Sequence, residues 1–147
     1  MIVESETERV QKVRKNLVEM LFVEGNHFCM FCEKSGNCEL QAQAYRLGIT
    51  APKYPFMFPE RDVDASHPEI LIDRNRCILC GRCVRVCQDI LGIEAISFNR
   101  RGAETVIGGA FGRPLAESGC TFCGSCVEVC PTGALKDRGD EWDRWPD

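Results

Sequence analysis

The sequence predicts an α+β protein in which a helical amino-terminal segment precedes a repeated βαβ unit. Apolar residues near the amino terminus recur at helical spacing, which indicates an amphipathic helix. Further along the chain one four-cysteine pattern occurs twice, and short runs of β-branched residues flank both copies. A duplicated motif set between strands is typical of a domain with internal pseudo-twofold symmetry.

The first helix is expected to begin near Ser5, because Glu8 three residues later completes a capping-box pattern. Gly25 marks its expected end. The apolar positions that recur at helical spacing are Val10, Val13, Leu17, Met20, Leu21 and Phe22. We interpret this face as a packing surface for a neighbouring domain or a partner subunit, with no chemistry of its own.

A loop rich in metal-ligating residues follows, with the sequence GNHFCMFCEKSGNCELQ. It supplies three thiolates, from Cys29, Cys32 and Cys38, and the imidazole of His27. The chain has eleven cysteines, whereas three cubane clusters need twelve ligands, so His27 is the candidate for the remaining ligand. A neutral imidazole in place of a thiolate would raise the reduction potential of that cluster. The other histidine, His67, is interpreted as a turn residue.

Between this loop and the first four-cysteine copy, the sequence predicts a short helix and then an extended arm. The helix ELQAQAYRL ends at Gly48. In the arm Pro52, Pro55 and Pro59 alternate with aromatic residues, which excludes a regular helix or a central strand. The aromatic side chains favour an ordered arm on apolar surface, either on a partner or over the clusters of this chain.

The two four-cysteine copies are CILCGRCVRVCQ, which begins at Cys77, and CTFCGSCVEVCP, which begins at Cys120. Their C-x2-C-x2-C-x3-C spacing is that of bacterial ferredoxins, in which the fourth cysteine ligates the other cluster. We therefore expect two 4Fe-4S clusters with exchanged ligands, one held by Cys77, Cys80, Cys83 and Cys130 and the other by Cys120, Cys123, Cys126 and Cys87. Paired cysteines also build zinc sites, but a zinc ion has no use for the third and fourth cysteines of each copy.

Four short strands are expected around these motifs. EILID (69–73) precedes the first copy, and GALKD (133–137) follows the second and pairs with it. IEAISF and ETVIGGAF form a hairpin, joined by a turn from Asn99 to Gly102, that minimal ferredoxins lack. The predicted fold class is thus a helical segment with a one-histidine, three-cysteine cluster site, followed by a bacterial-ferredoxin-like βαβ-βαβ module with two 4Fe-4S clusters.

The chain is expected to divide into four parts. These are a helical segment with the histidine- and cysteine-ligated 4Fe-4S cluster (1–50), a proline and aromatic linker arm (51–68), a two-4Fe-4S ferredoxin-like domain (69–137) and a carboxy-terminal tail (138–147). Arg74, Arg76, Arg82 and Arg85 surround the first copy and either offset the cluster charge or form an ordinary solvated set. In the tail, Trp142 and Trp145 are expected to anchor on a partner.

The composition of the chain restricts the cellular compartments and the classes of partner that we expect. The odd cysteine count, with no signal peptide, favours a reducing, cytoplasmic compartment over a disulfide scaffold. No apolar run is long enough to span a bilayer. The net charge of −4 without a basic block gives no support for nucleic-acid binding. A chain of 147 residues has a modest core, so metal ligation is expected to supply much of its stability.

Three runs of the sequence resemble a known family: MLFVEGNHFCMFCEKSGNCELQ, YPFMFPERDVDASHPEILIDRNRCILCGRCVRVC and CTFCGSCVEVCPTGAL. They resemble the small iron-sulfur diaphorase subunit of NAD(P)-reducing, bidirectional nickel-iron hydrogenases. More distantly, they are similar to the amino-terminal part of the complex I large iron-sulfur subunit, to iron-only hydrogenases and to NAD-dependent formate dehydrogenases. The resemblance covers almost the whole chain. This chain differs from the family pattern in two respects. His27 lies closer to the first cysteine than the histidine of the complex I branch does, and no plant-type 2Fe-2S pattern is present.

The resemblance implies an electron-transfer subunit with three 4Fe-4S clusters. It would relay electrons between a flavin-containing, NAD(P)H-binding diaphorase subunit and a hydrogenase small subunit or an equivalent redox module. The sequence has no glycine-rich nucleotide fingerprint and no flavin motif, so catalysis is expected to belong to the partners. The alternatives are an equivalent relay subunit of an NAD-dependent formate dehydrogenase or complex I-like enzyme, a free-standing polyferredoxin, and a zinc-stabilised interaction module.

Overall fold

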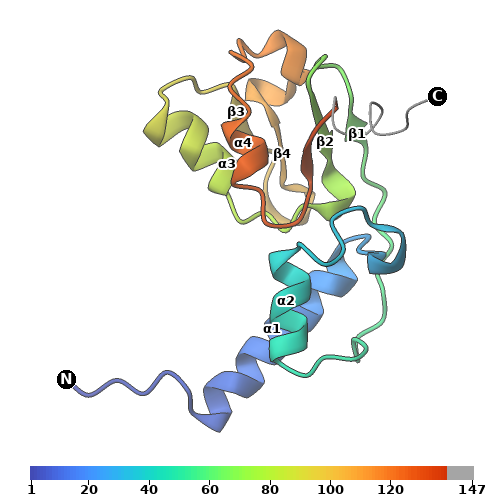
Figure 1. Ribbon diagram of the computed structural model, residues 1–147, viewed down its shortest axis with the longest axis vertical. Coiled ribbons are helices and arrows are strands. Elements are labelled where there is room, and N and C mark those ends of the chain that lie inside the picture. The colour runs from blue at the N-terminus through green and yellow to red at the C-terminus, as the bar shows by residue number, and fades with distance from the viewer. Residues whose placement is uncertain (139–147) are drawn as a thin grey trace. The chain divides into compact units, whose positions relative to one another are not determined.

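The structure is a computed structural model that describes residues 1–138. The chain forms two compact units, residues 1–60 (unit 1) and residues 61–147 (unit 2). Unit 1 contains two α-helices, and unit 2 contains five short strands and two short α-helices (Figure 1). The tryptophans expected to anchor the tail, Trp142 and Trp145, lie outside the described residues.

In unit 1, helix α1 (Glu8–Glu24) begins later than the sequence suggests. The expected cap at Ser5 is wrong, because Thr7 is the capping residue and its Oγ1 accepts the N–H of Val10 at 3.4 Å. The helix ends at Gly25 as predicted. Much of its apolar stripe is exposed in the chain alone, including Val13, Leu17 and Met20, and its predicted packing on a neighbouring domain or a partner subunit stays a prediction.

Helix α1 buries Val23 and the carboxylate of Glu19 against its surroundings within unit 1. Helix α2 (Glu39–Arg46) contributes the buried Leu40 and Ala44 and stops before Gly48, which has a left-handed φ of 62°. Between the two helices lies a single 3₁₀ turn, Cys29–Phe31, whose Met30 and Phe31 side chains are exposed. The small apolar core of unit 1 therefore lies where the two helices meet.

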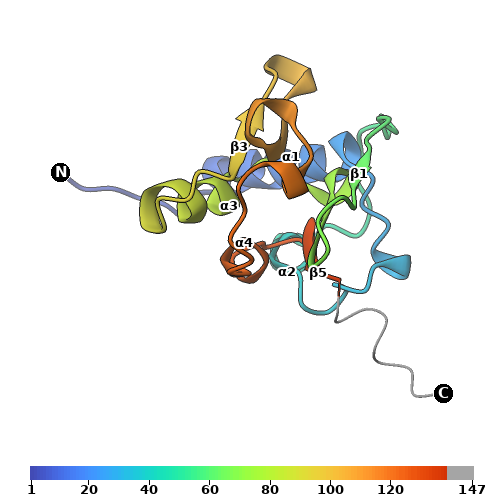
Figure 2. The ribbon, with the colours of Figure 1, turned by 90° about the horizontal axis from the view of Figure 1, so that it is seen from above.

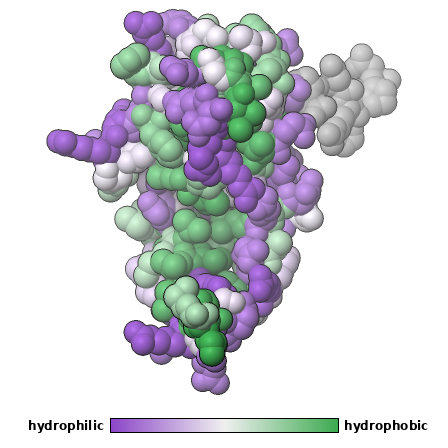
Figure 3. Space-filling model, turned by 90° about the vertical axis from the view of Figure 1, so that its left-hand side faces the viewer, coloured by the Kyte–Doolittle hydropathy of each residue, from purple (hydrophilic) through white to green (hydrophobic). Residues whose placement is uncertain are grey.

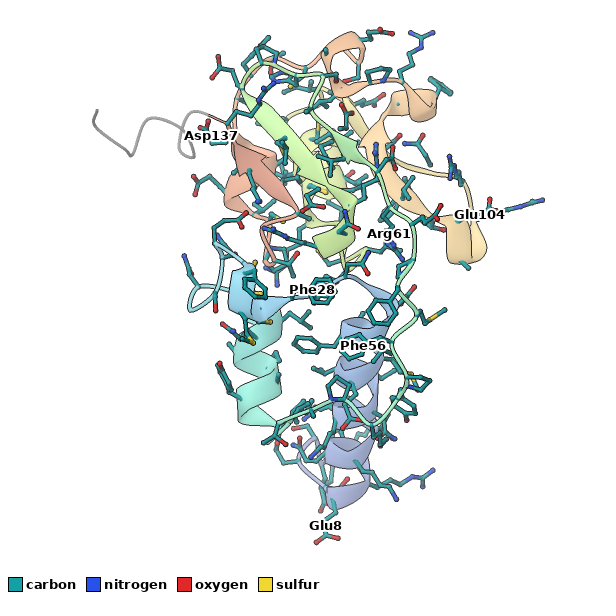
Figure 4. All side chains as sticks on the ribbon, turned by 90° about the vertical axis from the view of Figure 1, so that its right-hand side faces the viewer. Glu8, Phe28, Phe56, Arg61, Glu104 and Asp137 are labelled. Carbon is teal, nitrogen blue, oxygen red and sulfur yellow. The ribbon has the colours of Figure 1, made fainter. Side chains whose placement is uncertain are left out.

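The arm that follows α2 is ordered and runs along α1. The N–H of Met57 donates to the carbonyl of Val23 at 3.0 Å, and the Asn26 side chain donates to the carbonyl of Pro59 at 2.8 Å. The Lys53 ammonium lies 3.5 Å from the buried Glu19 carboxylate. Figure 4 labels Phe56 on this arm and Phe28 beside the 3₁₀ turn. The predicted ordered, extended arm is confirmed, and part of it packs on α1 of its own unit.

Unit 2 contains two small antiparallel sheets. Strands β1 (Val63–Asp64), β2 (Ile70–Asp73) and β5 (Leu135–Asp137) form one sheet in the order β1-β2-β5. Strands β3 (Ile96–Asn99) and β4 (Val106–Gly109) form the other (Figures 1 and 2). The predicted β2–β5 pairing and the β3–β4 hairpin are confirmed. Strand β1, which extends the first sheet at its edge, was not predicted.

The helices of unit 2 follow the cysteine loops. Helix α3 (Arg82–Arg85) continues into a π-helical turn, Val86–Ile90, that ends before Gly92. Helix α4 (Ser125–Glu128) follows the second loop and contacts α3. The core joins both sheets to both helices, and its most buried members are Ile72, Ile96, Ile107 and Leu115, together with Cys83, Cys87 and Cys126. Three cysteines are therefore part of the hydrophobic core of this unit.

Candidate metal centres

The first cavity of unit 2 is lined by cysteines from both four-cysteine motifs. Three come from the loop before α3, namely Cys77, Cys80 and Cys83, and the fourth is Cys130, which follows α4. Apolar side chains complete the walls, including Ile107 from β4 and Leu135 from β5. The cysteines of this first cavity are those that the exchanged-ligand hypothesis assigns to one cluster.

The second cavity is lined by the complementary set. Cys120, Cys123 and Cys126 come from the loop before α4, and Cys87 comes from the π-helical turn after α3. Ile70 of β2 and Ile96 of β3 are among its apolar walls. The two cavities are equal in volume, at about 10 Å³ each. Similar cavities with matched cysteines are suited to two copies of one group.

Hydrogen bonds between the two motifs hold the exchanged cysteines in place. The Thr132 hydroxyl, two residues after Cys130, donates to the carbonyl of Arg76 at 2.6 Å. The N–H of Asp73 donates to the carbonyl of Ala134 at 2.7 Å, beside the β2–β5 ladder. These contacts bring the segment after the second motif against the segment that leads into the first. Cys130 therefore reaches the first cavity because β5 pairs with β2.

Both loops use the same backbone conformations at equivalent positions. Leu79 and Phe122 have left-handed φ angles of 54° and 60°, and Gly81 and Gly124 follow with 72° and 70°. A glycine adopts this conformation without strain, and each of the two glycines caps the helix that follows. At Gly81 a side chain would also collide, because an added Cβ would lie 3.0 Å from the ring of Phe98. The two loops are therefore structural repeats as well as sequence repeats.

The cysteines of each cavity differ in burial, and this difference shifts their pKa values. Burial, together with nearby cysteines, raises the pKa of the Cys83 and Cys126 thiols to about 12. By contrast, the backbone N–H of Ser125 lowers the pKa of the exposed Cys123. Because soft metals bind thiolates rather than thiols, loading of these cavities must release protons from the buried cysteines. A bound metal would supply the positive charge that replaces these protons in an otherwise apolar site.

The cysteine group of unit 1 is formed within one short stretch of chain. Burial raises the pKa of the Cys29 thiol, and the neighbouring Cys38 and Cys32 raise it further, so the three cysteines lie close together. The ring of His27 packs edge-on against Phe22, with centroids 5.8 Å apart, and its Nε2 atom is buried. The structure therefore groups the three predicted cysteines, and ligation by His27 stays a prediction.

Gln41 is a residue of this site that the sequence did not reveal. Its side chain is buried, accepts the N–H of Gly36 at 2.8 Å and donates to the Ser35 hydroxyl at 3.2 Å. It also hydrogen bonds to Cys29 and thereby lowers the pKa of that thiol slightly against the larger effect of burial. Gln41 thus fixes the turn between Cys32 and Cys38. The sequence signal that could have identified Gln41 was its position three residues after Cys38, on the face of α2 that points back to the loop.

The four arginines around the first motif have different environments. Arg74 is buried and donates to the carbonyl of Ile107 at 2.9 Å and to Asp62 at 2.8 Å. Arg76 lies 3.1 Å from the carboxylate of Asp73. The exposed Arg85 instead donates to the carbonyl of Cys80 at 3.2 Å. Arg74 is thus not part of an ordinary solvated set, because it belongs to the framework that holds β4 beside the first cavity. That the arginines offset a cluster charge stays a prediction.

The arrangement of the donors matches a cluster in which each thiolate binds a separate iron. Within residues 1–138 no three histidine, cysteine, aspartate or glutamate side chains converge as a single metal ion requires. In each cavity four thiol groups surround a largely apolar space. This donor set and this environment suit a 4Fe-4S cluster, whose soft iron prefers thiolate ligands.

Two family regions match the chain in order. Residues 14–53 match the NADH-ubiquinone oxidoreductase-G iron-sulfur binding region. Residues 67–136 match the ferredoxin-like domain of NADH-quinone oxidoreductase subunit 3. The boundary between these regions falls in the segment that leads from unit 1 to unit 2. No helix within residues 1–138 has the length and apolar character needed to cross a membrane.

Several curated proteins are similar to this chain. The gamma subunit of the NAD-reducing hydrogenase HoxS of Cupriavidus necator is 46% identical over 96 residues, which are 65% of this chain and 41% of that protein. The HndD subunit of the NADP-reducing hydrogenase of Solidesulfovibrio fructosivorans is 37% identical, over 97% of this chain and 24% of that protein. Subunit 3 of the NADH-quinone oxidoreductase of Thermus thermophilus is 35% identical, over 93% of this chain and 19% of that protein.

A solved structure agrees with these matches. A chain in the crystal structure of an NAD⁺-reducing [NiFe]-hydrogenase in the H₂-reduced state superposes with a TM-score of 0.84 and 42% sequence identity, over 97% of this chain and 60% of that chain. The chain spans less than half the length of the curated relatives described here. By its two matched regions and its relatives, the chain belongs to the iron-sulfur protein family that NAD(P)-reducing hydrogenases share with the large iron-sulfur subunit of complex I.

Proposed function

We propose that the chain binds three 4Fe-4S clusters and relays single electrons within an NAD(P)-linked hydrogenase complex. In unit 2, Cys77, Cys80, Cys83 and Cys130 would hold one cluster, and Cys120, Cys123, Cys126 and Cys87 another. In unit 1, His27, Cys29, Cys32 and Cys38 would hold the third. The observation that carries the proposal is that each cavity of unit 2 is lined by three cysteines of one motif and the fourth of the other.

The protein's own contribution to electron transfer is the environment of each site. A 4Fe-4S cluster supplies a one-electron carrier. The apolar walls exclude water, and backbone N–H groups donate to cysteine sulfur, as the N–H of Leu79 does to Sγ of Cys77 at 3.4 Å. Cys80 and Cys123 are exposed in the chain alone, so each cavity has one edge that a redox partner could approach. Because electron tunnelling weakens steeply with distance, we infer that electrons enter and leave unit 2 at these edges.

The partners follow from the relatives. The hydrogenase subunits to which the chain is similar are named as parts of NAD- and NADP-reducing enzymes. We therefore infer a flavoprotein diaphorase subunit on one side and a hydrogenase small subunit on the other, in the cytoplasm. The exposed apolar side chains of α1 offer a surface for such contacts, and hydrophobic patches (green) appear on the face shown in Figure 3. An equivalent relay in a formate dehydrogenase or complex I-like enzyme would use the same sites.

Anaerobic metal analysis tests the cluster count. Three clusters require about twelve irons and about twelve inorganic sulfides per chain. His27→Ala is expected to perturb the electron paramagnetic resonance signal of the unit 1 cluster alone, whereas Cys29→Ala should abolish that signal. An iron content near eight in the wild-type chain, with an unchanged spectrum in His27→Ala, would contradict a third cluster. Zinc in place of iron would contradict the proposal as a whole.

A free-standing polyferredoxin is a second candidate, and the exposed Cys80 and Cys123 favour it, since a mobile carrier needs accessible cluster edges. Affinity purification of the tagged chain from its native host distinguishes the two functions. A relay subunit should retain a flavin-containing, NAD(P)H-oxidising partner in constant stoichiometry. A free carrier should elute alone and be reduced by several unrelated donors.

A further inference from the structure

His67 is a fully buried histidine that belongs to none of the three cysteine groups. Its side chain is 1% exposed and lies at the bend before β2. Its Nδ1 accepts two backbone hydrogen bonds, from the N–H groups of Glu69 and Ile70, each at 3.1 Å. An imidazole nitrogen that accepts hydrogen bonds carries no proton, so the proton of the neutral ring is on Nε2. The position agrees with the predicted turn residue, but the burial was not foreseen.

The charge state of this ring supports the same tautomer. Burial lowers the pKa of His67, although the carboxylates of Glu69 and Asp64 oppose that shift. The ring is therefore neutral at physiological pH and presents one donor, Nε2–H. That atom is closed off from solvent and has no acceptor among residues 1–138. Buried donors in native proteins almost always have an acceptor, so this N–H points to a group that residues 1–138 do not supply.

His67 lies between the second cysteine loop and a residue that lines the second cavity. Its ring lies against the ring of Phe122, with centroids 4.4 Å apart and planes inclined by 44°. Phe122 stands between Cys120 and Cys123 in the left-handed turn of the second loop. The Nδ1 atom of the ring accepts a hydrogen bond from the N–H of Ile70, and Ile70 lines the second cavity. His67 is thus fixed by two segments that both border the second cavity.

We propose that Nε2–H of His67 donates a hydrogen bond to a sulfur atom of the cluster held in the second cavity. The inference rests on the proposed function, because it requires a cluster at that place. Cluster sulfur gains negative charge on reduction, so a hydrogen-bond donor stabilises the reduced form more than the oxidised form. His67 is therefore a positioning residue that raises the reduction potential of one cluster. Neither four-cysteine motif contains a histidine that could do the same for the first cavity.

The variant His67→Asn in the cluster-loaded chain tests this role. An asparagine side chain can still accept the backbone N–H groups of the bend, as in an Asx turn, but it lacks the ring N–H. At a fixed ambient potential near the midpoint, the ratio of reduced to oxidised cluster in the second cavity should fall about fivefold to tenfold, the size expected of one net hydrogen bond. The ratio for the first-cavity cluster should not change. Equal shifts at both clusters, or none at either, would overturn the proposal.

A second measurement keeps the test valid if His67→Asn loses its cluster. In ¹⁵N-histidine-labelled protein carrying Cys29→Ala, which removes the unit 1 cluster, pulsed paramagnetic resonance of the reduced second-cavity cluster should detect a ¹⁵N coupling from His67. The absence of that coupling, with the cluster present, would exclude the hydrogen bond and leave an N–H directed at the ring of Phe122. Iron analysis distinguishes a wrong function from a wrong role for His67. If the proposed function is wrong, the second cavity contains no iron. If only the role of His67 is wrong, the iron content of the second cavity is unchanged.

Discussion

The two units gather their cysteines in opposite ways. In unit 1 the cysteine group and its buried support, Gln41, lie within fifteen consecutive positions from 27 to 41. In unit 2 each cavity needs cysteines from motifs at opposite ends of the domain, brought together by the pairing of β2 with β5. A local site depends on one turn and one helix, whereas an exchanged pair of sites makes the fold and both clusters depend on one another.

The burial of the cysteines shows the same contrast. In unit 1 all three are half-buried, and the helices meet through other residues, among them Val23, Leu40 and Ala44. In unit 2, Cys83, Cys87 and Cys126 are members of the hydrophobic core. A core that contains ligands is stable only when the ligands have their metal, since metal-binding free energy then contributes to folding free energy. The two units should therefore respond differently to every change that touches iron.

Removal of iron should have the largest effect and should separate the units most clearly. Chelation under reducing conditions leaves the buried thiols of unit 2 around empty space, and we expect the amide hydrogen-exchange protection of β2, β5 and α3 to be lost. The α1–α2 pair should keep part of its protection, because its apolar contacts do not involve cysteine. Mass spectrometry of exchanged peptides gives the comparison. Equal loss in both units would show that the cores do not differ in this way.

Loss of a single exchanged ligand should have the second-largest effect. In Cys87→Ala the second-cavity cluster, not the first, is expected to be lost, together with about four irons per chain. The matched variant Cys29→Ala should remove about four irons from unit 1 and leave both signals of unit 2 unchanged. Iron analysis and paramagnetic resonance of the two variants check this. Loss of the first-cavity signal in Cys87→Ala would mean that the ligands are not exchanged.

Gln41→Leu tests whether the unit 1 site depends on the turn and the helix next to its cysteines. The substitution removes the acceptor for the N–H of Gly36 and the donor to Ser35, two part-buried hydrogen bonds that contribute about 0.5–1.5 kcal/mol each. The unit 1 cluster should then be released several times faster by a chelator, while the unit 2 clusters are released at the wild-type rate. Gln43→Leu, on the exposed side of the same helix, is the control. Identical rates in both variants would remove Gln41 from the site.

Gly109→Ala tests the hairpin that closes the first cavity. An added Cβ would lie 2.4 Å from the carbonyl oxygen of Arg113 and 3.0 Å from that of Pro114, so β4 must shift. Such overpacking costs about 1–3 kcal/mol and should loosen the Ile107 wall of the first cavity. Urea unfolding followed by cluster absorbance should show a lower midpoint. Gly112→Ala is the control. Its added Cβ would meet open space, but Gly112 has a φ of 75°, so this variant measures the cost of backbone strain alone.

The smallest expected effect is a pH dependence confined to unit 2. Burial holds the pKa of His67 below its ordinary value near 6.5, so the unfolded chain binds a proton that the folded chain does not. The stability contributed by His67 is therefore present above about pH 6.5 and is lost as the pH falls below that value. The difference in urea midpoint between the wild type and His67→Asn should shrink between about pH 7 and pH 5.5. A constant difference would mean that the pKa of His67 is the same in the folded and the unfolded chain.

Part of this arrangement could be predicted from residue spacing. The strands 69–73 and 133–137, their pairing and the hairpin 93–111 follow from β-branched runs between turn signals, and the structure contains them. The helix cap at Ser5 was predicted wrongly, because Thr7 is the capping residue, and the burial of Glu19 opposite Lys53 was not predicted. An ion pair formed with a residue more than thirty positions away leaves no periodic signal in either segment.

The sequence by itself determined the donor set, since eleven cysteines at these spacings specify which atoms can bind iron and which motif each belongs to. Only the tertiary structure decided which thiols are buried, which apolar residues line each cavity, and that Gln41 and His67 are buried beside the cysteine loops. The physical reason is that ligand identity and local turns depend on near neighbours in the chain. Burial and cavity walls depend on residues such as Ile70, Ile107 and Leu135, which only strand pairing and helix packing bring to the cysteines.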